Sequence, residues 1–266
     1  MSAVVTAASS ATAPAETAGN VLISGSYGGV YNAWHALRKG ARAVILNDAG
    51  GGRNNAGISG LDWLAALGIA GATADCWTCH IGDGEHMLEH GRISYVNAAA
   101  AKLGCVAGQS VRACAERLQS AGQSTAAIPG IAGGKRFALA NLHGGRAVLG
   151  LDAAPLLEPG DAGAIAITGS HAALFRGRPD NVIAVELFAA FFNDAGVGLD
   201  NAGIARLADL DSRMIAATVS ARSAEIGNAR DAYEHGVISY VNRPAAAAGI
   251  APGMRLRDVA EQLSRS

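Results

Sequence analysis

Short apolar runs alternate with longer amphipathic stretches along this chain of 266 residues. In the first part, residues 20–24, 41–46 and 70–74 have the composition of buried strands, and residues 30–39 and 60–67 have apolar positions at helical spacing. Strands that alternate with helices are typical of βα units. The pattern therefore predicts an α/β fold with mostly parallel sheets.

Three polar blocks of the first part occur again, in the same order, in the second part. Ser24-Gly25-Ser26-Tyr27 matches Thr168-Gly169-Ser170-His171, and Asn47-Asp48-Ala49-Gly50 matches Asn193-Asp194-Ala195-Gly196. The third block, residues 89–97, matches residues 234–242 everywhere except at Arg92 and Val237. Ordered matches of this kind indicate internal repetition. We expect a tandem duplication of one βα-repeat unit, with the two copies related by a pseudo-two-fold axis.

The repeat divides the chain into four parts: a tail (1–19), a first α/β repeat (20–119), a connector (120–164) and a second α/β repeat (165–266). The tail is rich in Ala, Ser and Thr, and we expect it to be disordered. In the connector, two β-rich runs, residues 136–142 and 146–151, flank His143-Gly144-Gly145, which predicts a β-hairpin. Residues 122–134, rich in glycine, form a linker or a lid.

Helices are also predicted at matching places in the two repeats, over residues 95–103, 240–248, 111–118 and 256–263. Ser94 and Ser239 are placed to N-cap the first two of these helices. Asn97 and Asn242 lie early in them, where a buried side chain that ties loop to helix is as reasonable as a ligand contact.

Composition narrows the classes of partner. Half of the residues are hydrophobic and 16% are charged, against roughly 25% charged in an average soluble domain. Much of the surface must therefore be small, neutral or covered by another chain, so we expect a homo-oligomer. The formal net charge is -1 and the cations are scattered, which argues against nucleic acid. No stretch approaches the roughly 20 apolar residues of a membrane span. The N-terminus lacks a signal-peptide pattern and the four cysteines lack a disulfide spacing, so we expect a cytoplasmic protein.

The polar blocks are expected at the carboxyl ends of strands, where open α/β sheets bind ligands. Ser26 and Ser170 each lie in a loop that leads from a strand to the next element, after Gly25 and Gly169. Such a loop is compatible with a strained elbow that exposes a nucleophile, with an anion cradle, or with a structural turn. All three interpretations stay open.

Asp48 and Asp194 are candidates for a general base or an orienting carboxylate. Asn47 and Asn193 precede them and are candidate donors to a developing oxyanion. The alternative is an Asx-type turn or cap, for which Asn, Asp and Gly are suited. Polar residues extend these loops, namely Arg53, Asn55 and Asn201.

The two repeats differ most after their third strands. Cys76-Trp77-Thr78-Cys79-His80 stands opposite residues 221–225. Haem attachment, a zinc site, a redox dithiol, a nucleophilic Cys79 and simple burial all remain open for the cysteines, and no metal or cofactor is predicted. Among the opposing residues, Arg222 can clamp a substrate carboxylate, beside Ser223 and Glu225, or form a surface ion pair. This divergence predicts one asymmetric composite site.

His90 and His235 precede Gly91 and Gly236 in the otherwise matching third block. Either imidazole is a candidate general acid or base. The structural alternative is a residue that caps the last carbonyls of a helix. Of the two, His235 is included among the predicted catalytic residues.

In broad plan this arrangement resembles ring-opening cyclic amidases of the cyanuric acid hydrolase and barbiturase type. In those enzymes tandem units surround a shared pseudo-symmetric site, and each unit contributes a serine. They pair their serines with lysines, whereas here Lys39, Lys102 and Lys135 match no serine loop. No residue role is therefore carried over from the resemblance.

Together these patterns predict a cofactor-independent hydrolase of amide or ring-opening type, acting on a small polar or carboxylate-bearing substrate between the two repeats. The predicted catalytic residues are Ser26, Ser170, Asp48, Asp194 and His235. The predicted substrate-binding residues are Gly25, Tyr27, Asn47, Arg53, Asn55, Gly169, His171, Asn193, Asn201, Arg222, Ser223 and Glu225. A lyase or isomerase acting on a small oxo acid, and a non-catalytic protein that binds an anion or metabolite, are the alternatives.

Overall fold

Two mostly parallel β-sheets, of five and six strands, form the framework of this computed structural model, which describes residues 2–124, 126–140, 145–179 and 182–266. Across the first sheet the order is β1 (Val4–Ala7), β2 (Val21–Tyr27), β3 (Ala43–Asn47), β4 (Gly71–Ala74) and β5 (Ile93–Val96). Across the second it is β11 (Ile238–Val241), β10 (Ile215–Val219), β9 (Ala189–Asn193), β8 (Ile165–His171), β7 (Val148–Leu151) and β6 (Arg136–Ala140). Neighbouring strands are parallel except β5, β6 and β11 at the edges. The prediction of an α/β fold with mostly parallel sheets is confirmed.

Helices cover both faces of each sheet. On the first sheet, α1 (Val30–Arg38) and α2 (Gly60–Ala66) lie on one face, and α3 (Gly84–His90), α4 (Ala98–Lys102) and α5 (Val111–Leu118) on the other. On the second sheet, α7 (Ala229–His235), α8 (Arg243–Ala247) and α9 (Leu256–Arg265) lie opposite α6 (Arg206–Asp209) and the 3-10 helix η3 (Ala154–Leu156). The other 3-10 helices are η1 (Ala15–Thr17), η2 (Arg53–Asn55), η4 (Pro159–Asp161), η5 (Phe175–Gly177) and η6 (Leu199–Ile204). In the described parts of the chain, no helix is long and apolar enough to cross a membrane.

The central strands are apolar because both of their faces are covered. All seven residues of β2 and all five of β3 and of β9 are buried. A parallel strand between two helix layers contacts apolar side chains on each face, so its sequence is a continuous apolar run instead of an alternating one. The runs predicted as strands in the first repeat are confirmed as β2, β3 and β4, and the helices between them as α1 and α2.

The prediction of a disordered tail over residues 1–19 is wrong for its described part. Val4 and Val5 belong to β1, which pairs in parallel with the N-terminal half of β2. Farther along, Ser10 is fully buried, and its hydroxyl lies 3.1 Å from the Ser24 hydroxyl. β-Branched residues beside an open strand edge outweigh the small, polar composition of the segment.

The predicted starts of two helices are also wrong. Residues that were expected to open helices after Ser94 and Ser239 instead form β5 and β11, antiparallel edge strands. The helices α4 and α8 begin later, where the side chains of Asn97 and Asn242 accept hydrogen bonds from backbone N–H groups and act as N-caps. Each serine hydroxyl instead lies 3.0 Å from that of a threonine on the neighbouring strand. The helices predicted over residues 111–118 and 256–263 are confirmed as α5 and α9.

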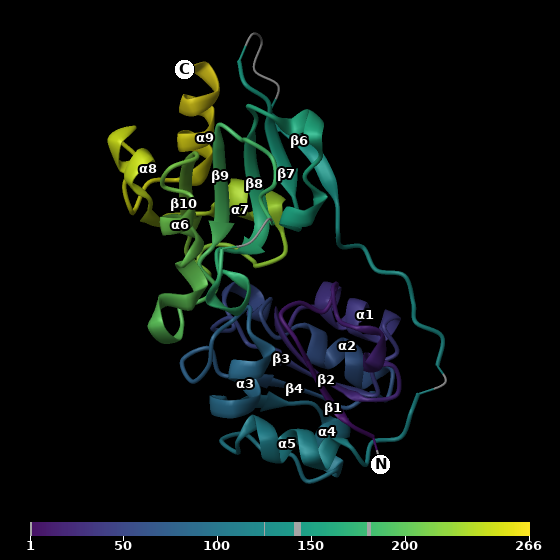
Figure 1. The fold of residues 1–266 in the computed structure, drawn as a ribbon. Helices are drawn as coiled ribbons and strands as arrows, with labels where there is room; N and C mark the ends of the chain where they lie inside the picture. The colour runs from purple at the N-terminus through teal and green to yellow at the C-terminus, as the bar shows by residue number, and fades with distance from the viewer. Residues whose placement is uncertain (1, 125, 141–144, 180–181) are drawn as a thin grey trace.

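The predicted hairpin is present as β6 and β7, which are antiparallel. Two residues of its predicted turn, His143 and Gly144, lie outside the described residues. Because β7 also pairs in parallel with β8, the hairpin is part of the second sheet and not a separate connector. Residues 119–124 and 126–135 lie along one side of the molecule, between α5 and β6 (Figure 1).

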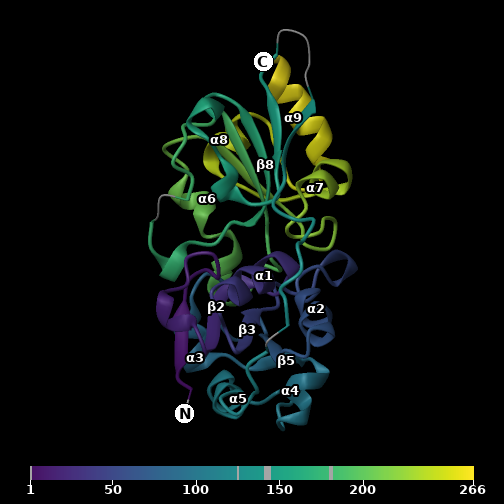
Figure 2. The ribbon, with the colours of Figure 1, turned by 90° about the vertical axis from the view of Figure 1, so that its right-hand side faces the viewer.

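The two sheets stand end to end, and the termini lie at opposite ends of the molecule (Figures 1 and 2). The loop that follows β3 meets the loop that follows β9, and a Cβ atom built on Gly196 would lie only 3.0 Å from the Gly50 Cα. The carboxyl ends of the parallel strands of one half therefore face those of the other half.

Hydrogen bonds across this junction come in pairs. The Arg53 N–H donates to the Ala221 carbonyl (2.7 Å), and the Leu199 N–H donates to the Cys76 carbonyl (2.8 Å). Side chains follow the same scheme, since Asn54 donates to Glu225 (2.7 Å) and the His80 Nε2 lies 2.9 Å from an Asp200 oxygen. These bonds fix the facing loops in one arrangement.

Two glycines of these loops offer a matched test of the contact. Gly198 and Gly51 both have φ near 70°, yet a Cβ on Gly198 would lie 2.8 Å from the Cys76 carbonyl oxygen and one on Gly51 would meet nothing within 4 Å. We expect Gly51→Ala to lower the free energy of unfolding by about 1 kcal/mol through backbone strain alone. Gly198→Ala should cost roughly 1–3 kcal/mol more, from overpacking. Urea denaturation measures both, and equal losses would contradict the close contact between the halves.

Candidate functional site

A cavity of about 280 Å³, called the inner cavity below, lies between the two halves and brings both predicted serines together. Ser26 comes from β2 and Ser170 from β8, and Tyr27 and His171 line the same space. Side chains that the sequence did not single out complete it, chiefly Tyr31, Asn32, His35, Asp152, Phe175 and Arg206. The cavity thus lies where the carboxyl ends of both sheets converge, the usual ligand position in open α/β sheets.

Each serine hydroxyl is held by a backbone donor. The Ser26 Oγ accepts the N–H of Ser10 (3.0 Å), and the Ser170 Oγ accepts the N–H of Ala154 (2.9 Å). Ser26 is 5% exposed, whereas Ser170 is partly exposed. Because the backbone bond uses only an oxygen lone pair, each O–H remains able to donate to a ligand or a base.

Only glycine fits at the position before each serine, because another backbone segment passes close to its Cα atom. A Cβ on Gly25 would lie 2.3 Å from the Asp83 nitrogen, and one on Gly169 would lie 2.7 Å from the Asn228 nitrogen. The Gly25 carbonyl accepts the Gly82 N–H, and the Gly169 carbonyl accepts the N–H of Gly227. The glycine positions therefore join each strand to the loop that leads to α3 or α7.

His35 is one of the residues of the inner cavity that the sequence analysis missed. Its Nε2 is shielded from solvent and has no hydrogen-bond partner within the described chain. Burial lowers the pKa of this imidazole, and the nearby charges of Lys39 and Arg38 lower it further. A neutral imidazole can accept a proton at pH 7. A histidine at the end of an amphipathic helix carries no motif, so only the fold could reveal its place.

A second cavity of about 490 Å³, called the outer cavity, adjoins the inner one. Tyr27, Tyr31 and Asp152 line both cavities. Burial raises the pKa of the Tyr27 phenol above its ordinary value, and the charge of Asp152 raises it further; the pKa of Tyr31 shifts the same way for the same causes. Both phenols are therefore protonated at neutral pH and can donate hydrogen bonds.

Asp48 and Asp194, predicted as base or orienting carboxylates, accept hydrogen bonds from the backbone. The Asp48 Oδ1 accepts the N–H groups of Gly50 and Cys76, and the Asp194 Oδ1 accepts those of Gly196 and Ala221. Both are about 95% buried and line neither the inner nor the outer cavity. They fix the turns at the junction of the halves, which is the Asx-turn alternative.

Asn47 and Asn193, predicted as oxyanion donors, also contact the backbone of nearby loops. Their Oδ1 atoms accept the N–H groups of Ala49 and Ala195, each at 2.9 Å. The Asn193 Nδ2 donates to the Ala224 carbonyl, and the Asn47 Nδ2 lies 3.8 Å from the Cys79 sulfur. These amides hold the strand end to the next loop.

The remaining predicted residues separate into two groups. Glu225 lines the outer cavity. The others line neither the inner nor the outer cavity: Arg53, Asn55, Asn201, Arg222, Ser223 and His235. His235 is the last residue of α7, with its Nε2 3.8 Å from an Asp231 oxygen. The Ser223 hydroxyl donates to the Ser220 carbonyl and accepts the Val237 N–H, and Arg222 is exposed.

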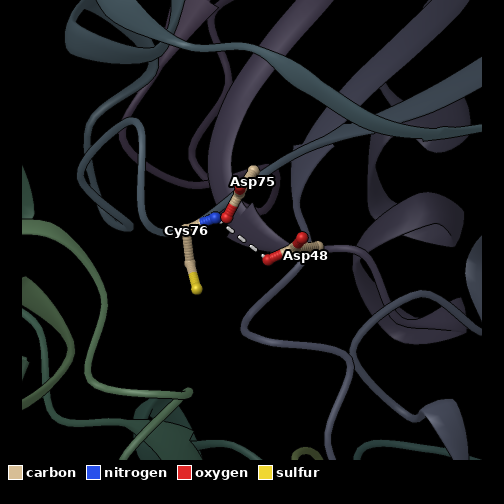
Figure 3. A group of neighbouring side chains, drawn as sticks. All are labelled: Asp48, Asp75 and Cys76. Carbon is tan, nitrogen blue, oxygen red and sulfur yellow. Dashed lines mark hydrogen bonds between the residues drawn. The ribbon is translucent and has the colours of Figure 1, made fainter. Parts of the chain in front are cut away.

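Asp48, Asp75 and Cys76 bring potential metal ligands within 4.8 Å of one another (Figure 3). Burial raises the pKa of the Cys76 thiol well above its usual range, and the charges of Asp48 and Asp75 add to the shift. A protonated thiol is a poor metal ligand. Burial also raises the pKa of Cys79 to about 12, which disfavours a nucleophilic thiolate there. All four cysteines are free.

Comparison with protein-family models, with curated proteins and with solved structures finds no match for this chain. The geometry of the two cavities is therefore the basis on which a function can be inferred.

The two substitutions Asp48→Ala and Asp48→Asn separate a structural carboxylate from a catalytic one. Removing the side-chain oxygen leaves the buried Cys76 N–H and the more exposed Gly50 N–H without an acceptor, so Asp48→Ala should lower the free energy of unfolding by about 1–3 kcal/mol. Asp48→Asn keeps the Oδ1 acceptor and should retain most of the stability. Thermal and urea denaturation of both variants measure the difference, and similar losses for the two would refute the backbone role.

Proposed function

We propose that the protein is a cofactor-independent hydrolase that cleaves a small amide in the inner cavity. One observation carries the proposal: Ser26 and Ser170, one from each half, line the same cavity as His35, whose shielded Nε2 has no hydrogen-bond partner among the described residues. A hydroxyl, a neutral imidazole and a second hydroxyl donor are the groups that acyl transfer requires.

The chemistry follows from these groups. The serine Oγ attacks the acyl carbon while its proton passes to His35, and a new C–O bond forms. The C–N bond then breaks, and His35 returns the proton to the leaving amine. Water attacks the acyl-enzyme in the same way, which releases the carboxylic acid and restores the serine O–H.

The two serines are given different roles because their access differs. Ser170 is partly exposed to the cavity and is assigned as the nucleophile, whereas Ser26 is nearly buried and is assigned as a hydrogen-bond donor to the oxyanion. The fixed backbone bond to each Oγ orients the hydroxyl before substrate arrives.

The proposal includes the tandem duplication, with the two copies related by a pseudo-two-fold axis. Its support is that hydrogen bonds at the junction occur at matching positions of the two halves. The Arg53 N–H donates to the Ala221 carbonyl, and the Leu199 N–H donates to the Cys76 carbonyl. The site is nevertheless asymmetric. Gly227 lines the outer cavity, whereas at the matching Gly82 the carbonyl accepts the Arg176 N–H (3.0 Å). The inner and outer cavities, which share Tyr27, Tyr31 and Asp152 in their walls, are taken as the ligand site.

A neutral His35 would also serve a lyase or isomerase that moves a proton beside a carboxylate. In that reaction the serines only bind, so neither becomes acylated. Exchange of solvent deuterium into oxo acids, without serine modification, would favour this alternative. Homo-oligomerisation and a cytoplasmic location remain predictions from composition, and size-exclusion chromatography with light scattering tests the first.

A fluorophosphonate tests the hydrolase without a known substrate. The Ser170 Oγ should form a P–O bond, break the P–F bond and release fluoride, while His35 takes the proton. Labelling should rise with pH to a plateau, with a midpoint below about 6.5 because the His35 pKa is lowered. His35→Gln should slow labelling about a hundredfold. Peptide mass spectrometry identifies the modified residue.

Ser124, an exposed serine, provides the matched control. Ser124→Ala should label as the unaltered protein does, and Ser170→Ala should not label. Labelling that persists in Ser170→Ala, or an absence of labelling in the unaltered protein, would remove the serine mechanism.

A further inference from the structure

We propose that the outer cavity is the carboxylate-binding part of the same site, so that the substrate is a small amide whose nitrogen side carries a carboxylate and whose acyl side is uncharged. N-Acyl amino acids are the simplest molecules of this class. The inference rests on the proposed function for the position of the scissile bond. The carboxylate site itself stands on the outer cavity alone.

Two cations of the outer cavity are unpaired, although two carboxylates line the same space. Lys135 and Arg230 form no ion pair with any described residue, and both are exposed. The carboxylates take neutral donors instead. Asp152 accepts the N–H groups of Lys135 and Ala229, and Glu225 accepts the side-chain amides of Asn54 and Asn228. The positive charges are therefore left for an external anion.

The Phe137 ring holds the Arg230 guanidinium in an orientation that can bind an anion. The guanidinium carbon lies 4.6 Å from the centre of the Phe137 ring. Stacking on an aromatic ring fixes the plane of a guanidinium and leaves its edge N–H groups available. Such an edge can bind a carboxylate through two parallel hydrogen bonds. Lys135 adds a second positive charge in the same wall.

Asp152 lies in the wall shared by the two cavities. Each of its oxygens accepts one backbone N–H, and each carboxylate oxygen has a further lone pair. Such an acceptor favours a ligand N–H and repels a ligand carboxylate at this point. The ligand is thereby ordered with its amide nitrogen near Asp152 and its carboxylate at Arg230.

The inner cavity continues beyond Asp152 with apolar residues. Pro155, Leu156 and Phe175 contribute to its wall, which the two serines also line. An uncharged acyl group fits these contacts, and its carbonyl lies on the side of Ser26 and Ser170. The three parts of the ligand thus match the three regions of the wall, which are apolar, acidic and cationic.

The test uses a matched pair of probes, N-benzoylglycine and its neutral carboxamide, N-benzoylglycinamide. Affinities are measured by ligand-observed NMR titration against the full chain carrying Ser170→Ala, which prevents turnover. We expect N-benzoylglycine to bind at least about tenfold more tightly than the carboxamide, from charge-assisted hydrogen bonds to the cations.

Three arginine substitutions locate the contact. Arg230→Gln should weaken the binding of N-benzoylglycine about tenfold and leave the affinity for the carboxamide unchanged. Arg230→Lys should restore part of the loss, because the charge is kept. Arg112→Gln, on the exposed side of α5, should change neither affinity. Thermal denaturation of each variant shows whether it is folded.

Equal affinity for the two probes, no binding of either, or an unchanged preference in folded Arg230→Gln would overturn the inference. These outcomes are separate from failure of the hydrolase proposal. A carboxylate preference that depends on Arg230 supports the outer site even if fluorophosphonate labelling fails. Labelling of Ser170 without that preference supports the hydrolase and rejects the outer site.

Discussion

The close approach of the loops after β3 and β9 is the constraint on which the rest of the structure depends. Gly50 and Gly196 meet backbone to backbone, and the paired hydrogen bonds of Arg53 and Leu199 fix the two halves around them. Because the carboxyl ends of both sheets face this junction, the loops that would bind ligand in a single sheet are largely covered by the other half. The inner cavity, which Ser26 and Ser170 both line, lies beside this junction.

The same constraint explains why the polar residues that occur in both halves are of two kinds, those that bind the backbone at the junction and those that line the cavity. Side chains at the centre of the junction, such as Asp48 and Asp194, have their oxygens occupied by backbone N–H groups. Those farther out, such as Ser26 and Ser170, reach the cavity. The polar blocks that occur in both halves therefore reflect the needs of the junction as much as those of chemistry.

Much of the fold could be predicted from the sequence, because buried parallel strands are continuous apolar runs and both helices of the first βα units have clear spacing. The errors came where tertiary pairing outweighed local composition. β1 forms because β2 has a free edge, and Tyr95 lies in a strand because β4 offers an antiparallel partner. For the site, the sequence singled out Ser26 and Ser170 but placed them in loops, whereas they lie near the ends of β2 and β8. His35, Asp152 and Arg230 could not be predicted, since they come from a helix, a strand-following loop and a distant helix with no shared motif.

The central claim is that the two halves form one fixed unit with a site between them, and amide hydrogen exchange tests it most directly. The junction amides of Arg53 and Leu199 should be protected to the same degree as the central strands and should exchange with them, because they open only when the halves separate. Exchange of these two amides at the rate of exposed loops, while β2 and β9 stay protected, would show that the halves separate freely and would contradict the account.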